Sequence, residues 1–203
     1  MQVLIATTNQ AKLERYKRLL AQIEIEGLSP TDLGLDPIDV DEGTDIQENA
    51  RIKALAYLGK TDLPILGNDA ALYLDGEELD PALTKRNALE GMDESQLSQE
   101  DIRDAIISFY KSLVQKRGEL IPGTWKDIYA LVMPDGSVHV EISLRPILLT
   151  DTVMGEVHPY FPMRSMYINV LTGKYTAQQS EEEHLQEMQP IIDALSKLKS
   201  RLN

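Results

Sequence analysis

A chain of 203 residues is long enough for one sizeable hydrophobic core and short for two independent domains, so we expect a single two-lobed domain over residues 1–203. It has no cysteine, which excludes disulfide bonds, thiolate metal sites and a cysteine nucleophile. Its formal net charge of −13 argues against binding to a nucleic acid polymer, because that affinity needs clustered lysine and arginine. No apolar stretch approaches the roughly 20 residues of a membrane span, and the N-terminal apolar run lacks a basic flank. We therefore expect no membrane partner and a cytoplasmic location.

The N-terminal segment predicts a buried strand that runs into a helix through a polar turn. Residues 3–6 are continuously apolar, as in a strand that is buried on both faces. Helical spacing of apolar residues follows the polar run Thr7, Thr8 and Asn9. Thr8 or Asn9 is the natural N-cap, and the free N–H groups of a first helical turn favour an anion placed there. Lys12, one turn into the predicted helix, can add a positive charge to the same anion.

The second informative segment predicts another helix behind an acidic loop. Thr44 and Gln47 have the three-residue offset of a capping box, so the predicted helix starts directly after Thr44. Asn49 and Lys53 are four residues apart and share one face of this helix. Glu42 precedes the cap and can project from the loop toward whatever the helix end faces.

The third informative segment repeats the pattern of the first. Residues 63–66 predict a strand that runs into Gly67, Asn68 and Asp69. Asp69 is thus expected at the carboxyl end of a strand, where open α/β sheets keep their ligand crevices.

The remaining segments complete the pattern of an α/β protein. They predict one or two helices at 93–117, a hairpin of strands 125–133 and 136–144, an irregular segment at 152–165, a short strand at 166–171, and a final helix over 185–202 that restarts at Pro190.

In this order and spacing, the three motifs resemble those of the inosine triphosphate pyrophosphatase family, whose members hydrolyse noncanonical purine nucleoside triphosphates. The family's T/S-x-N-x-x-K loop matches Thr7, Asn9 and Lys12, its acid and ENAxxKA segment match Glu42 and residues 48–54, and its DDSGL segment matches residues 68–72. The resemblance covers roughly the first 145 residues. Each motif alone has a structural explanation as a helix cap, a solvated loop or a turn, and only their joint occurrence favours a functional site.

The resemblance implies a fold, a reaction and a site. The fold is α/β, with a long mixed twisted sheet flanked by helices and a central cleft between two lobes. The reaction is Mg²⁺-dependent hydrolysis of a nucleoside triphosphate to the monophosphate and pyrophosphate, in a homodimer. Glu42 and Asp69 bind the metal, and Asp69 also serves as the base. The residues that bind the substrate phosphates are Thr7, Thr8, Asn9, Lys12 and Lys53.

Two departures from the family pattern leave alternatives open. Asn68 replaces the first acid of DDSGL, which removes a negative charge expected near the metal. The base-gripping GGFGYDP loop and Ser-His-Arg have no counterpart: Arg164 stands where the loop's aspartate would fall, and Ser-His-Arg occurs nowhere. The base preference is therefore not carried over. The chain is then either an enzyme, a nucleotide-binding or sensor protein that has lost turnover, or a protein with a vestigial site that acts through dimerisation or partner binding.

Overall fold

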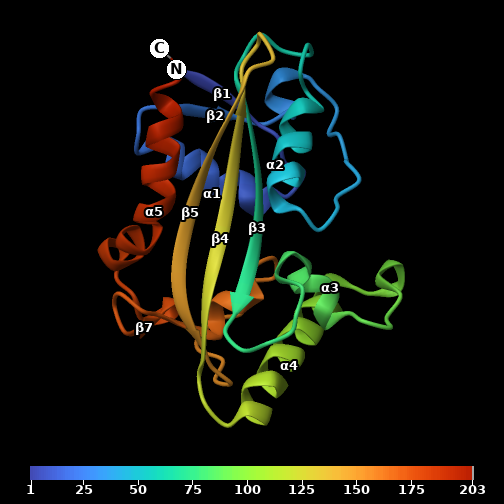
Figure 1. Cartoon of the computed structure of the whole chain (residues 1–203), viewed down its shortest axis with the longest axis vertical. Coiled ribbons are helices and arrows are strands. Elements are labelled where there is room, and N and C mark those ends of the chain that lie inside the picture. Colours follow the sequence, from blue (N-terminus) through green and yellow to red (C-terminus); the bar gives the residue numbers. More distant parts are fainter. Residues whose placement is uncertain (203) are drawn as a thin grey trace. The chain divides into compact units, whose positions relative to one another are not determined.

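The computed structural model describes residues 1–202 and shows a mixed sheet flanked by helices (Figure 1). The strands are β1 (Gln2–Ile5), β2 (Glu26–Leu28), β3 (Ile65–Leu74), β4 (Ile121–Val132), β5 (Val138–Leu149), β6 (Tyr167–Asn169) and β7 (Lys174–Tyr175). The α-helices are α1 (Gln10–Ala21), α2 (Ile46–Leu55), α3 (Thr84–Ala88), α4 (Gln99–Arg117) and α5 (Glu181–Lys199).

The sheet confirms the predicted α/β class and its mixed character. Within the described residues, its strand order is β2-β1-β3-β4-β5-β6-β7. β1 pairs in parallel with both β2 and β3, whereas β6 pairs antiparallel with β5 and β7. Parallel pairing near the N-terminus requires crossover connections, and α1 and α2 lie in those connections.

Most predicted elements are present, with shifted ends. The helix predicted within 93–117 is α4, which Ser98 caps through a capping box and which ends at Gly118 in the left-handed conformation. The predicted hairpin is longer than expected and turns where the N–H of Met133 donates to the carbonyl of Ser137 at 2.9 Å. The predicted restart at Pro190 is wrong, because α5 continues through this residue. Its buried neighbours on either side, Met188 and Ile191, hold the helix against a core despite the missing N–H.

The contacts divide the chain into two compact units. Unit 1 comprises residues 1–70, residues 126–144 and the segment from residue 189 onward, and unit 2 comprises residues 71–125 and 145–188. Each has a buried apolar cluster of its own. The single two-lobed domain and its cleft remain predictions. No helix within residues 1–202 combines the length and the apolar composition needed to cross a membrane.

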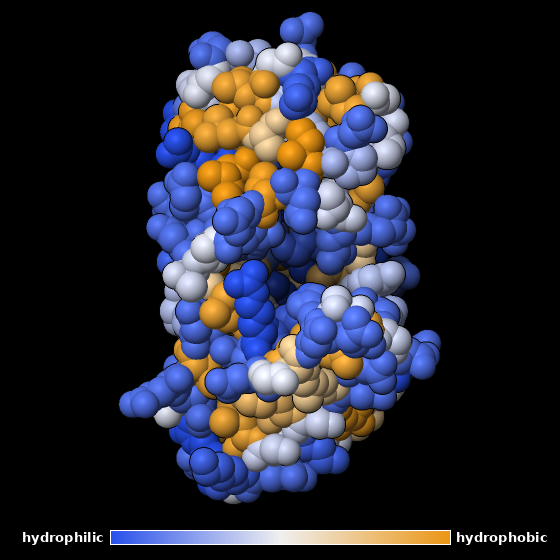
Figure 2. Space-filling model, turned by 90° about the vertical axis from the view of Figure 1, so that its right-hand side faces the viewer, coloured by the Kyte–Doolittle hydropathy of each residue, from blue (hydrophilic) through white to orange (hydrophobic). Residues whose placement is uncertain are grey.

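In unit 1, α1 and α2 cover opposite faces of the sheet. Leu4 of β1 packs in one cluster with Ala54 and Tyr57, at the end of α2 and just beyond it. Ile5 points the other way, since a Cβ built on Gly27 would lie 2.6 Å from Ile5 Cδ1 and 3.1 Å from Leu20 Cδ1 of α1. Figure 2 shows apolar side chains gathered at the surface on the α2 side. The side chains of α1 and α2 that pack on these two faces are therefore separated by the sheet.

Candidate active site

The turn between β1 and α1 is closed by hydrogen bonds of its own side chains. Asn9 has an extended backbone and is the N-cap of α1, and its Oδ1 accepts from the N–H of Lys12 at 3.0 Å. Thr7 Oγ1 accepts from the N–H of Asn9 at 3.2 Å, while Thr8 is exposed. The first intrahelical bond runs from Leu13 N to Asn9 O, so the N–H groups of Gln10 and Ala11 have no acceptor within the helix. Of the two predicted caps, Asn9 is therefore correct.

The loop before α2 is fixed by Asn49. Its Oδ1 accepts from the N–H of Gly43 and its Nδ2 donates to the carbonyl of Gly43, both at 2.9 Å. This pair of bonds holds the backbone next to Glu42. The predicted cap Thr44 is wrong, because Asp45 caps α2 by accepting from the N–H groups of the second and third helical residues. A carboxylate is a strong acceptor for this purpose and displaces the threonine.

Two carboxylates, one ammonium group and one amide meet between α2 and β3. Lys53 Nζ donates to Glu42 Oε2 at 2.7 Å and to Asp69 Oδ1 at 3.0 Å. Asn49 Nδ2 donates to the other oxygen of Asp69, Oδ2, at 2.9 Å. Only 8% of Asp69 is exposed. The structure therefore brings Glu42, Lys53 and Asp69 together as predicted, and adds Asn49, which sequence analysis had placed on the helix face of Lys53 without a role.

Asp69 does not lie at the end of a strand, which corrects the prediction. β3 continues to Leu74, and its residues Ala71, Leu72 and Leu74 are buried in unit 2. The pairing with β1, however, ends at Ile5 and Leu66. Asp69 therefore lies just beyond the carboxyl end of the parallel β1–β3 pair. Open α/β sheets form their ligand crevices at this edge.

The α1 turn lies beside this cluster. The N–H of Ala6 donates to the carbonyl of Leu66 at 2.8 Å, so the turn starting at Thr7 leaves the sheet next to the residues that lead to Asp69. The pKa of Lys12 is lowered to about 8, mainly by burial and next by the nearby Lys53 ammonium, while Asp69 acts in the opposite direction. The charge of Lys53 therefore acts on Lys12. The predicted roles of Thr7, Thr8, Asn9 and Lys12 toward phosphate remain predictions.

Behind the turn, α1 is tied to β4 by a buried ion pair that sequence analysis did not predict. Arg15 Nη2 lies 3.2 Å from Asp127 Oδ1 and donates to Tyr16 Oη at 2.9 Å. Asp127 is almost fully buried. Because the partners are 112 residues apart in sequence, only the sheet order could have revealed the pair. It holds α1, and with it Lys12, against the sheet.

Asn68 ties β3 to β4 rather than weakening the carboxylate pair. Its Nδ2 donates to the carbonyl of Ile128 at 3.0 Å, a bond that the aspartate of the family motif could not make. Since neighbouring residues of a strand point to opposite faces, Asn68 and Asp69 face away from each other. The loss of a negative charge at residue 68 therefore leaves the charge at Glu42 and Asp69 unchanged.

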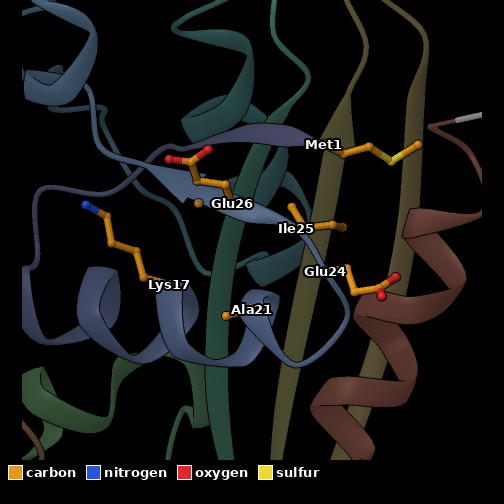
Figure 3. A pocket seen from close by; sticks show the side chains of 7 residues that line it. Met1, Lys17, Ala21, Glu24, Ile25 and Glu26 are labelled. Carbon is orange, nitrogen blue, oxygen red and sulfur yellow. The ribbon is translucent and has the colours of Figure 1, made fainter.

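A pocket elsewhere in unit 1 contains none of these residues. It lies beside the edge strand β2 and is lined by Met1, Lys17, Ala21, Glu24, Ile25, Glu26 and Gly27 (Figure 3). Its charged side chains come from α1, from the turn before β2 and from β2 itself, and Lys17 pairs with Asp32 at 2.7 Å. We assign no function to this pocket.

Known proteins match the part of the chain that forms this cluster. The model of the Ham1 family matches residues 3–103, the span that contains every residue predicted for the site. The dITP/XTP pyrophosphatase of Brucella melitensis is 30% identical over 138 residues, which are 66% of this chain and 60% of the relative. That of Mesorhizobium japonicum is 31% identical over 141 residues, with the same two shares. The match thus spans about three fifths of the length of these curated relatives.

Solved structures agree over nearly the whole chain. The Staphylococcus aureus Ham1 protein has a TM-score of 0.72 and 20% identity, and the match covers 100% of this chain and 98% of that one. A HAM1 protein from Coxiella burnetii has a TM-score of 0.74 and 16% identity, with 99% of both chains covered. At these identities the likeness establishes the fold alone. Taken with the matched motifs, it confirms the resemblance of this chain to the inosine triphosphate pyrophosphatases, and residues 3–103 match the Ham1 family.

Proposed function

We propose that this chain hydrolyses a nucleoside triphosphate to the monophosphate and pyrophosphate, with a noncanonical purine nucleotide as substrate and Mg²⁺ as cofactor. The observation that carries the proposal is the meeting of Glu42 and Asp69 at the ammonium group of Lys53, beside the open end of α1. The relatives named dITP/XTP pyrophosphatases support the substrate class.

The donor set suits magnesium. Mg²⁺ prefers oxygen ligands and is usually held by one or two carboxylates together with substrate phosphates. Glu42 and Asp69 would supply the carboxylates, and they already share one positive partner. Within residues 1–202, no group of three or more His, Cys, Asp or Glu side chains is arranged to hold a metal. Phosphate oxygens and water would complete the coordination. When bound, the ion supplies positive charge to the phosphate oxygens.

The protein's own residues would position the substrate and the attacking water. Lys12, Lys53 and the N–H groups at the start of α1 provide positive charge and donors for the phosphates. Asp69 orients the water and accepts its proton, while the bond from Asn49 to Oδ2 fixes the rotamer of its side chain. Catalysis of this kind depends on placement, which explains why Asp69 is held from two sides.

Pyrophosphate release tests the proposal. ITP, dITP, XTP and the standard triphosphates are incubated with the protein and Mg²⁺, with EDTA as a control. Release of pyrophosphate from at least one of them, abolished by EDTA, is expected. If no triphosphate is cleaved but one raises the melting temperature, the chain is a nucleotide sensor. If neither occurs, the site is vestigial.

The pH dependence of binding tests the role of Lys12. Because its pKa is about 8, the side chain is charged below that pH and neutral above it. Bound phosphate favours the charged form. Triphosphate affinity should therefore be constant below pH 8 and fall as the pH rises, by up to about tenfold per unit. Titration of a non-hydrolysable analogue between pH 6.5 and 9.5 measures this. Lys12→Arg, which stays charged, should flatten the curve, and an unchanged fall in that variant would remove Lys12 from the role.

Two further expectations come from the resemblance and the composition. We propose that the chain acts as a homodimer in the cytoplasm, and that its substrate is a free nucleotide rather than a nucleic acid polymer. The net charge of −13 supports the second statement. Light scattering in solution measures the mass of the assembly.

A further inference from the structure

Lys53 contacts the same two carboxylates that the proposed function gives to the divalent ion. Its ammonium nitrogen lies 2.7 Å from Glu42 Oε2 and 3.0 Å from Asp69 Oδ1, and only 16% of the side chain is exposed. One cation is thus already bound to both acids. A second cation that uses these oxygens must compete with the first, because two positive charges at contact distance repel strongly in a partly buried site.

Asp69 does not need Lys53 to stay in place, and the backbone beside Glu42 is also held independently of Lys53. Asp69 is held separately through Oδ2 by Asn49, and the same Asn49 binds both backbone groups of Gly43, next to Glu42. Lys53 is a long, flexible side chain with three rotatable donors. The ammonium group is therefore the movable member of the cluster, whereas Asp69 and the backbone beside Glu42 are its fixed parts.

The charges of the cluster couple the ion to the nucleotide. The charges of Lys12 and Lys53 balance those of Glu42 and Asp69, and the pKa of Lys12 is lowered first by burial and then by the nearby Lys53 ammonium. A divalent ion alone would leave the cluster with two surplus positive charges. A triphosphate supplies the missing negative charge and a new partner for a displaced ammonium group.

We propose that Lys53 and the divalent ion exchange on Glu42 and Asp69: the ammonium group holds the two acids until the ion takes them, and it then moves to the triphosphate. This inference rests on the proposed function and adds a regulation of its site. Its consequence is that the ion binds weakly by itself and that the ion and the nucleotide strengthen each other's binding, as linkage requires.

The experiment measures binding of Mn²⁺ alone, an ion that also takes oxygen ligands, through the electron paramagnetic resonance signal of the free ion. Lys53→Met removes the competing charge and keeps the chain length, so this variant should bind Mn²⁺ at least about tenfold more tightly than the wild type. Lys53→Arg keeps the charge and should show no gain. Lys60→Met, at an exposed lysine seven residues away, is the matched control and should also show none.

A double variant assigns the gain to the carboxylate pair rather than to the acidic surface of the protein. Lys53→Met with Glu42→Gln should lose the tighter Mn²⁺ binding. The affinity for a non-hydrolysable triphosphate should move in the opposite direction and fall in Lys53→Met. Lys53→Gln, which keeps donors without the charge, replaces Lys53→Met if unfolding curves show that the methionine variant is not folded.

The outcomes separate this inference from the proposed function. A folded, uncharged variant that binds Mn²⁺ no more tightly than the wild type overturns the exchange, even if the wild type releases pyrophosphate. A tenfold gain in a protein that cleaves no triphosphate supports the exchange and refutes the hydrolase.

Discussion

Asp69→Asn is expected to lower the rate of pyrophosphate release by roughly 10²–10⁴-fold, the range for loss of a positioned base. The change removes a negative charge from the pair that would bind the ion. It also disturbs the contacts, because Lys53 and Asn49 each donate to a different oxygen of Asp69. Asparagine offers one oxygen, so its amide group must face one of these donors. The free energy of unfolding should therefore fall by about 1–3 kcal/mol.

The measurement compares kcat at saturating Mg²⁺ and nucleotide, together with a denaturant unfolding curve. Asp62→Asn changes an exposed acid shortly before β3 and is the matched control, with no expected effect on either quantity. Glu42→Gln should reduce the rate with a smaller loss of stability, because Glu42 is more exposed than Asp69. A folded Asp69→Asn protein that turns over at the wild-type rate would show that the base lies elsewhere.

Features that depend on a few neighbouring residues could be predicted from the sequence. The cap of α1 at Asn9 and the capping box of α4 at Ser98 are local, since each polar side chain binds N–H groups within its own turn. The meeting of Lys53 and Asp69 was predicted only because the motifs occur in a known order. Composition and periodicity alone would not have joined an α2 side chain to a β3 side chain.

Features that depend on strand pairing could not be predicted. The run Gly67-Asn68-Asp69 resembles the end of a strand, yet β4 lies alongside and its Ile128 carbonyl accepts from Asn68. The polar residues are therefore compatible with a continuing strand. Arg15 and Asp127 illustrate the same limit, since their pairing depends on the position of β4 in the sheet.

The C-terminal part departs furthest from the family pattern. Arg164, which stands in the position of an expected aspartate, has Nη2 3.2 Å from Nδ1 and 3.5 Å from Nε2 of His184. An atom at such similar distances from both ring nitrogens lies over the face of the imidazole, because in the ring plane it would collide with Cε1. The guanidinium of Arg164 thus contacts the imidazole of His184. Neither the motif nor the spacing indicated this contact.

Gly67→Ala is expected to destabilise the protein and to disrupt the site in one step. A Cβ at residue 67 would lie 2.0 Å from the carbonyl oxygen of Ala50 and 3.0 Å from the amide nitrogen of Ala54. Both are backbone atoms of α2, so no side-chain rotation can relieve the clash and the helix must move away from β3. We expect a loss of about 1–3 kcal/mol or more in the free energy of unfolding, the usual cost of overpacking.

The same movement would separate the donors of α2 from Asp69. Asn49 and Lys53 directly precede Ala50 and Ala54, so a helix pushed outward carries both away from the carboxylate. A displacement of about 1 Å can cost on the order of 10²-fold in rate, so the folded fraction of Gly67→Ala should also turn over slowly. Gly43→Ala is the matched control, because a Cβ there meets nothing within 4 Å. If Gly67→Ala and Gly43→Ala unfold at the same denaturant concentration, the close approach of α2 to β3 does not require a glycine at residue 67.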